Sequence, residues 1–208
     1  MKQLNVHYCG WGEDWLLGQL ADDGHALLFE YAPEALTQQL ELSPLHLKLR
    51  SEAYGDFPVH LHRLPGLIAD SLPDGWGLML MDRVFRQQSL RHPGPLDRLA
   101  FIGERAMGAL RFEPVREIDA AEPDWNLLAL ATESARAVAG EADSVLRELA
   151  LTGGSPQGAR PKAVVQFDPV GGDISTRSDA PGAPWLVKFP AQGEHKEVCA
   201  IEQFYSEL

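Results

Sequence analysis

The sequence has no long hydrophobic run and very few cysteines. None of its 208 residues belongs to an uninterrupted apolar stretch of about 18 residues, so we expect no membrane-spanning helix. The start, MKQLNVHYCGWGEDW, lacks the apolar centre of a signal peptide. Cys9 and Cys199 lie near opposite ends, and two reduced thiols in a cytosolic protein are favoured over a disulfide between them. These absences together predict a cytoplasmic protein.

Positive charge is also scarce. The chain carries 18 Lys and Arg residues against 30 Asp and Glu residues, a net charge of −12. Binding to nucleic-acid phosphates requires a basic face, so we expect no direct nucleic-acid binding by this chain. Contact with nucleic acid through a basic partner protein stays open. The 45% hydrophobic and 23% charged residues are ordinary for a globular protein, and the length allows one large domain or two small ones.

The sequence also contains no clear cluster of metal-binding residues. His60 and His62 have the spacing to share one face of a strand, but no third ligand lies nearby. Two ligands seldom make a site, and surface histidines are the favoured interpretation. We therefore predict no metal site in this chain.

The first half of the sequence alternates between apolar and polar residues in several short runs. Residues 4–8, 15–20 and 26–31 have the period of strands, and Asp23-Gly24 supplies a hairpin turn between the last two. The alternation returns over 42–49 (LSPLHLKL). This part is predicted to be a β-rich module.

From residue 64 the apolar period becomes helical. Leu78, Met81, Val84 and Phe85 form a helical stripe, a short helix is predicted over 96–101, and the chain then returns to a strand that ends at Phe112. The charged, proline-flanked stretch 113–123 is the best linker candidate.

The second half mixes helices and strands. Helices are predicted over 124–139, capped by Gly140, and over 144–151, followed by strands over 163–167 and 185–189 and a helix that starts near His195. The fold class is therefore α+β. No internal repeat interrupts this order.

A glycine-rich turn, Thr152 to Lys162, is the first feature that suggests chemistry. Its glycines at 153, 154 and 158 allow backbone N–H groups to surround an anion. It is not a Walker A loop, because Ala159-Arg160 stands where that motif requires Lys followed by Ser or Thr. On its own, such a segment is more often a simple turn.

Two charged residues follow this turn in a suggestive order. Lys188 lies inside the apolar run WLVKF, and Glu202 follows 14 residues later in a predicted helix. Separately, the lysine is explained by a side chain that reaches solvent from a strand edge, and the glutamate by a solvated helix face. As the ordered set of loop, strand lysine and helix glutamate, they are typical of the nucleotide-phosphate grip of a protein-kinase N-lobe.

Four longer stretches resemble the HipA family of serine/threonine kinase toxins. They are LPDGWG (72–77), FIGERAMGALRF (101–112), GGSPQGARPK (153–162) and WLVKFP (185–190). The resemblance implies that residues 1–113 form the N-terminal subdomain of that family, a β-rich unit with a helical insert. It implies that residues 121–208 form a truncated protein-kinase-like N-lobe whose C-lobe is absent.

The resemblance also implies roles for individual residues. The nucleotide site would comprise the loop residues Gly154, Ser155, Gln157, Gly158 and Ala159 together with Lys188 and Glu202. Lys188 matches the nucleotide lysine of the family, and Ser155 matches its regulatory phosphosite. Gln157 departs from the small residue frequent in that position, which puts the loop geometry in question.

The family implies the cofactors ATP and magnesium, an aminoacyl-tRNA synthetase as substrate, and a helix-turn-helix antitoxin of the HipB kind as partner. Phosphoryl transfer also requires a catalytic Asp and metal-binding Asn and Asp residues, whereas residues 189–208 contain neither Asp nor Asn. We therefore expect no catalytic residue in this chain, no activity from it alone and no tightly bound cofactor. Two other functions stay open: a non-catalytic or antitoxin-like module that docks on a separate kinase or repressor chain, and a small-molecule kinase.

Overall fold

The computed structural model describes residues 2–73, 75–90, 92–115, 126–140, 150, 160–177, 179–190, 193–195 and 197–206. The chain forms two compact units. The first comprises Met1–Leu72 and Leu90–Asp119, and the second comprises Pro73–Ser89 and Ala120–Leu208. The division at 113 and 121 inferred from the sequence stays a prediction, and these units differ from it by assigning residues 73–89 to the second unit.

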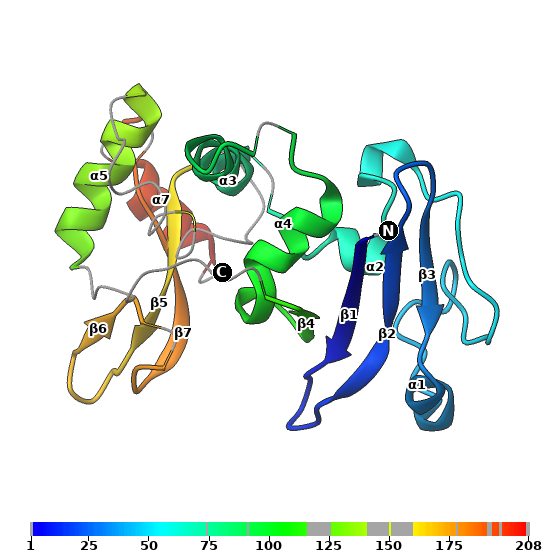
Figure 1. Cartoon of the computed structure of the whole chain (residues 1–208). Coiled ribbons are helices and arrows are strands. Elements are labelled where there is room, and N and C mark those ends of the chain that lie inside the picture. The colour runs from blue at the N-terminus through cyan, green and yellow to red at the C-terminus, as the bar shows by residue number, and fades with distance from the viewer. Residues whose placement is uncertain are drawn as a thin grey trace. The chain divides into compact units, whose positions relative to one another are not determined.

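A four-stranded antiparallel sheet organises the first unit (Figure 1). Its strands are β1 (Lys2–Tyr8), β2 (Trp15–Asp22), β3 (Leu27–Tyr31) and β4 (Leu110–Glu113), in the order β3-β2-β1-β4. Alternate residues of β1 are buried, as the period of two predicts. The hairpin turn is present as well, because the Asp23 carboxylate accepts hydrogen bonds from the backbone N–H groups of His25 and Ala26, both at 2.8 Å.

Short helices complete the first unit. They are α1 (Pro33–Gln38), the 3-10 helix η1 (Val59–Leu61), α2 (Gly66–Ala69), α4 (Pro95–Ile102) and the 3-10 helix η2 (Gly103–Arg105). Helix α4 confirms the helix predicted over 96–101, and β4 confirms the return to an extended strand. The core of this unit includes Phe29, Phe101 and Phe112, whose side chains are almost completely buried.

The alternating segment 42–49 is not a strand, so that prediction was wrong. Pro44 has no N–H group to give to a ladder, and the backbone N–H of Leu47 instead bonds the Ser43 carbonyl at 2.9 Å, as in a turn. Leu47 is buried whereas Leu45 is 83% exposed. The buried side chain of Leu47 therefore anchors a loop. The alternation of leucines in this segment does not reflect the two faces of a sheet.

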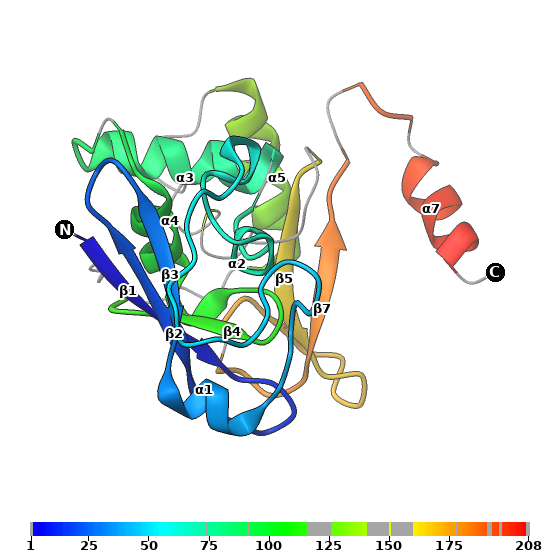
Figure 2. The same ribbon diagram turned by 90° about the vertical axis from the view of Figure 1, so that its right-hand side faces the viewer.

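The second unit combines helices with a three-stranded antiparallel sheet. Its helices are α3 (Gly75–Gln87), α5 (Leu127–Ala139) and α7 (Val198–Ser206), and its strands are β5 (Lys162–Phe167), β6 (Ile174–Ser175) and β7 (Ala183–Lys188). The strand order is β6-β5-β7, and β5 and β7 run side by side in both views (Figures 1 and 2). The mixture of helices and antiparallel sheets confirms the α+β class.

Sequence signals explain where these helices lie. The predicted stripe of α3 is buried at Met81, Val84 and Phe85. Helix α5 begins after Asn126, whose side chain accepts a hydrogen bond from the Ala129 N–H at 2.8 Å, and ends at Gly140 with a φ of 83°. The helix predicted over 144–151 lies outside the described residues apart from residue 150. None of the helices in the described part of the chain has the length and apolar character needed to cross a bilayer.

Candidate functional site

Lys188 is the last residue of β7. It lies directly opposite Lys162, the first residue of β5, in the antiparallel register of the two strands. Its side chain is 41% exposed, whereas Lys162 is buried. The apolar run of β7 therefore ends with a partly solvated ammonium group at one end of the β5–β7 ladder.

Glu202 lies on α7 and forms a close ion pair with this lysine. The Lys188 Nζ atom donates a hydrogen bond to the Glu202 Oε1 atom. The hydrogen bond from Lys188 lowers the pKa of the Glu202 carboxyl below its ordinary value, and nearby Arg160 lowers it further. At neutral pH the carboxylate is thus ionised and holds the lysine side chain in one direction.

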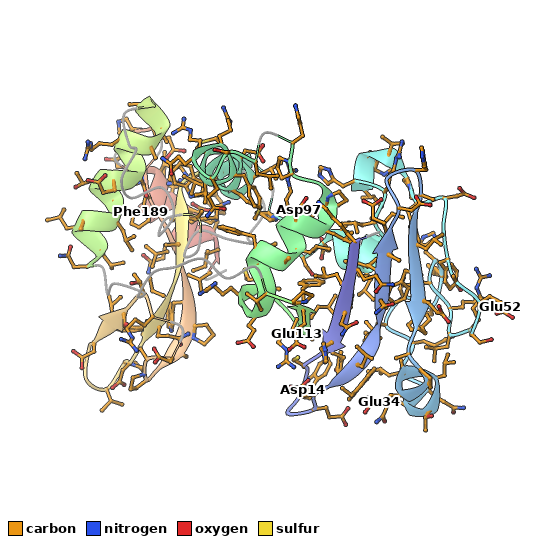
Figure 3. All side chains as sticks on the ribbon, viewed as in Figure 1. Asp14, Glu34, Glu52, Asp97, Glu113 and Phe189 are labelled. Carbon is orange, nitrogen blue, oxygen red and sulfur yellow. The ribbon has the colours of Figure 1, made fainter. Side chains whose placement is uncertain are left out.

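Arg160 is a third member of the cluster. Its Nη1 atom donates to Glu202 Oε2 at 2.6 Å, and its Nη2 atom lies 3.1 Å from Glu194 Oε2. Its Nε atom donates to the backbone carbonyl of Phe189 at 3.1 Å; Figure 3 labels Phe189. The side chain is only 17% exposed. Each oxygen of Glu202 therefore has its own cation, Lys188 on one and Arg160 on the other.

The structure brings together two of the residues predicted from the sequence, Lys188 and Glu202, and their roles stay predictions. The predicted loop residues Gly154, Ser155, Gln157, Gly158 and Ala159 lie outside the described residues. Sequence reasoning did not assign Arg160 or Glu194 to the site. The sequence signal for Arg160 was its position within the glycine-rich turn, two residues before β5 begins at Lys162, but this position does not identify Glu202 as its partner.

This arrangement suits the binding of an anion rather than a metal ion. An ammonium group held in place by a carboxylate still has N–H donors left, and these can bind a phosphate. Among the described residues, no group of His, Cys, Asp and Glu side chains could hold a metal ion. His60 and His62 do not share a strand face, because η1 occupies residues 59–61 and His62 ends it with a φ of 57°.

A separate polar cluster lies on the first unit. The Arg111 Nη1 atom is 2.9 Å from Asp14 Oδ2, and the Cys9 thiol donates to Asp14 Oδ1 at 3.7 Å. The Arg111 Nε atom also lies 3.5 Å from Glu113 Oε1, and Figure 3 labels Asp14 and Glu113. Burial first, and then the Asp14 charge, raise the pKa of the free Cys9 thiol. A protonated thiol is a poor nucleophile, so this raised pKa does not favour nucleophilic chemistry at Cys9.

A comparison with protein families gives one match. A family model described as the HipA N-terminal domain matches residues 10–113, which is half of the 208-residue chain. The matched range contains α3 and the strands β2 to β4, whereas Arg160, Lys188 and Glu202 lie outside it. No curated protein matches the chain in a sequence search.

Proposed function

This chain belongs to the HipA family through its N-terminal domain, and from that premise we propose that it is the N-terminal part of a HipA-like serine/threonine protein kinase. The family implies a toxin–antitoxin context with a partner protein. In this proposal, residues 121–208 form part of a kinase N-lobe, and ATP is the phosphoryl donor.

The observation that carries the proposal is the contact between Lys188 and Glu202 at the end of the β5–β7 ladder. Protein kinases hold the α- and β-phosphates of ATP with a strand lysine, and a glutamate on the following helix keeps that lysine in place. Here the lysine ends a strand, the glutamate lies on the next described helix, and a glycine-rich turn precedes the paired strand. The same order of parts supports the same use.

The remaining parts of the site follow from this assignment. The backbone amides of residues 154–159 would cover the phosphates, and Ser155 would be a regulatory phosphosite. Magnesium would be held by residues of a C-lobe, since no catalytic residue is expected in this chain. The chain alone is therefore inactive and binds ATP weakly in this proposal.

The proposed substrate is a serine of an aminoacyl-tRNA synthetase, and the proposed partner is a helix-turn-helix antitoxin of the HipB kind. Phosphorylation of a synthetase would slow translation, which connects the kinase to toxin action and bacterial persistence. The protein acts in the cytoplasm in this proposal, where both partners and ATP are present.

Phosphate transfer by the intact protein tests the proposal. The intact protein is incubated with radiolabelled ATP, magnesium and a panel of purified aminoacyl-tRNA synthetases, with a Lys188→Ala variant as the matched control. We expect label on a serine of one synthetase with the wild type and none with the variant. A folded intact protein that labels no synthetase but binds a repressor or kinase chain would favour the docking module instead. Label on a small molecule would favour a small-molecule kinase.

A further inference from the structure

Arg160 makes three contacts that meet at the end of the β5–β7 ladder. Its Nε atom donates to the Phe189 carbonyl at 3.1 Å, and its two terminal nitrogens contact Glu202 at 2.6 Å and Glu194 at 3.1 Å. The guanidinium group is planar, so these three directions are fixed relative to one another. One side chain thus ties a strand end to the helix that carries Glu202.

The backbone next to Lys188 is held from both sides. The Phe189 N–H donates to the Pro161 carbonyl at 2.8 Å, while the Phe189 carbonyl accepts from Arg160. Phe189 itself is buried. The backbone bond to Pro161 therefore extends the β5–β7 pairing by one residue beyond Lys188, and the Arg160 side chain adds a second bond to that residue.

We propose that Arg160 is a positioning residue for phosphoryl transfer, which orients Glu202 so that its second oxygen faces Lys188. This inference rests on the proposed kinase function. Arg160 would touch neither ATP nor the substrate, and it would act on the reaction only through the carboxylate. It would also keep the glutamate helix docked at the strand end before nucleotide arrives.

The chemistry of the contact explains why an arginine is needed here. Glu202 is 41% exposed, so water competes for its oxygens, and a single lysine partner would leave the carboxylate free to rotate. A guanidinium group that is itself fixed by Glu194 and by a backbone carbonyl removes that freedom. Lysine could not replace it, because its single ammonium group cannot hold the same three directions.

A double-mutant cycle in the intact protein separates positioning from a general structural effect. The variants are Arg160→Lys, Glu202→Gln and the two combined, and kcat/KM for ATP is measured for each. Because a misplacement of about 1 Å can cost about 100-fold in rate, we expect Arg160→Lys to lose about 10- to 100-fold. If Arg160 acts through Glu202, the double variant should be no slower than Glu202→Gln alone.

Two controls keep the result interpretable. Arg136→Lys changes another arginine of the second unit, which pairs with Glu133 at 2.9 Å on α5, and should leave kcat/KM unchanged. If Lys188→Ala retains full activity, the proposed function has failed at this site. If Lys188→Ala is inactive but Arg160→Lys matches the wild type, or its loss multiplies with that of Glu202→Gln, only the positioning role is overturned.

A measurement on the 208-residue chain tests the contact without any catalysis. The Glu202 carboxyl is followed by carbon NMR across acidic pH in the wild type, in Arg160→Gln and in Arg136→Gln. Removal of the Arg160 charge should raise the pKa of Glu202, and removal of Arg136 should not. An unchanged Glu202 titration in the folded Arg160→Gln variant would overturn the proposal.

Discussion

Replacement of Lys188 by alanine should separate activity from stability. Lys188 ends β7, which is an edge strand among the described strands, and its side chain is 41% exposed. Substitutions of this kind usually change the free energy of unfolding by no more than about 0.5 kcal/mol. Glu202 keeps its contact with Arg160 in the variant, so its carboxylate is not left without a cation.

Leu130 gives the matched contrast within the same unit. It lies on α5, and none of its surface is exposed. Leu130→Ala removes buried methyl groups and leaves a cavity, which costs about 2–5 kcal/mol in comparable cores. Its folded fraction should nevertheless keep its phosphoryl-transfer rate, because Leu130 takes no part in the proposed site.

The activities should show the opposite order. Loss of an electrostatic donor that stabilises transferring charge costs about 100- to 1,000-fold in enzymes, and we expect at least the lower figure for Lys188→Ala. Urea unfolding followed by circular dichroism measures stability, and label transfer from ATP by the intact protein measures activity. Retained phosphorylation in Lys188→Ala, or a loss of stability as large as that of Leu130→Ala, would refute this reasoning.

Three further predictions concern the chain alone, the loop serine and acid pH. In the proposed function, the magnesium ligands belong to a C-lobe. The 208-residue chain, incubated with radiolabelled ATP and magnesium, should therefore stay unlabelled, and calorimetry should give no dissociation constant in the micromolar range or tighter. Phosphorylation of Ser155 would add about −1.5 to −2 charges beside the nucleotide phosphates, and an aspartate imitates part of that charge. In the intact protein, Ser155→Asp should therefore lose ATP binding, while Ser155→Ala retains it. Equal ATP affinities in the two variants would mean that Ser155 only stabilises a turn. The pKa of Glu202 is lowered from 4.5 in the folded protein, so its stabilising effect should be complete above pH 4.5 and disappear as pH falls through the lowered value. Urea unfolding at several pH values should therefore show a flatter acid dependence for Glu202→Gln than for the wild type.

Periodicity predicted most of the regular elements because the local signals were unambiguous. Strands β1 and β3 bury alternate residues, whereas β2 departs from strict alternation at Leu17 and Gly18, which are both buried. Helix α5 has both an N-terminal cap and a C-terminal glycine. The segment 42–49 failed because a short alternation of leucines looks the same in a strand and in a loop anchored by one buried residue. Only the contacts of Leu47 decide between them, and these depend on the rest of the core.

For the candidate site, the sequence predicted only those residues that can be recognised from their type and their order along the chain. Lys188 and Glu202 could be paired from the sequence because a kinase N-lobe places them on consecutive elements. Arg160 and Glu194 could not, because their meeting depends on the path of the chain after β7 and on how α7 is placed. A charged residue next to a strand has many possible partners of opposite charge, and the sequence does not show which of them it contacts.

Because of helix α3, no single cut in the sequence separates the two units of this chain. The helix belongs to the second unit although it lies within the range of the N-terminal family match, so the backbone crosses between the units at residues 72–73, 89–90 and 119–120. Its Arg83 donates to the Ala137 carbonyl of α5 at 2.7 Å, and its apolar face is buried. A single protease cut after residue 113 would therefore leave two pieces that still share a folded unit. Expression of residues 1–113 alone would separate α3 from α5 and the rest of the second unit.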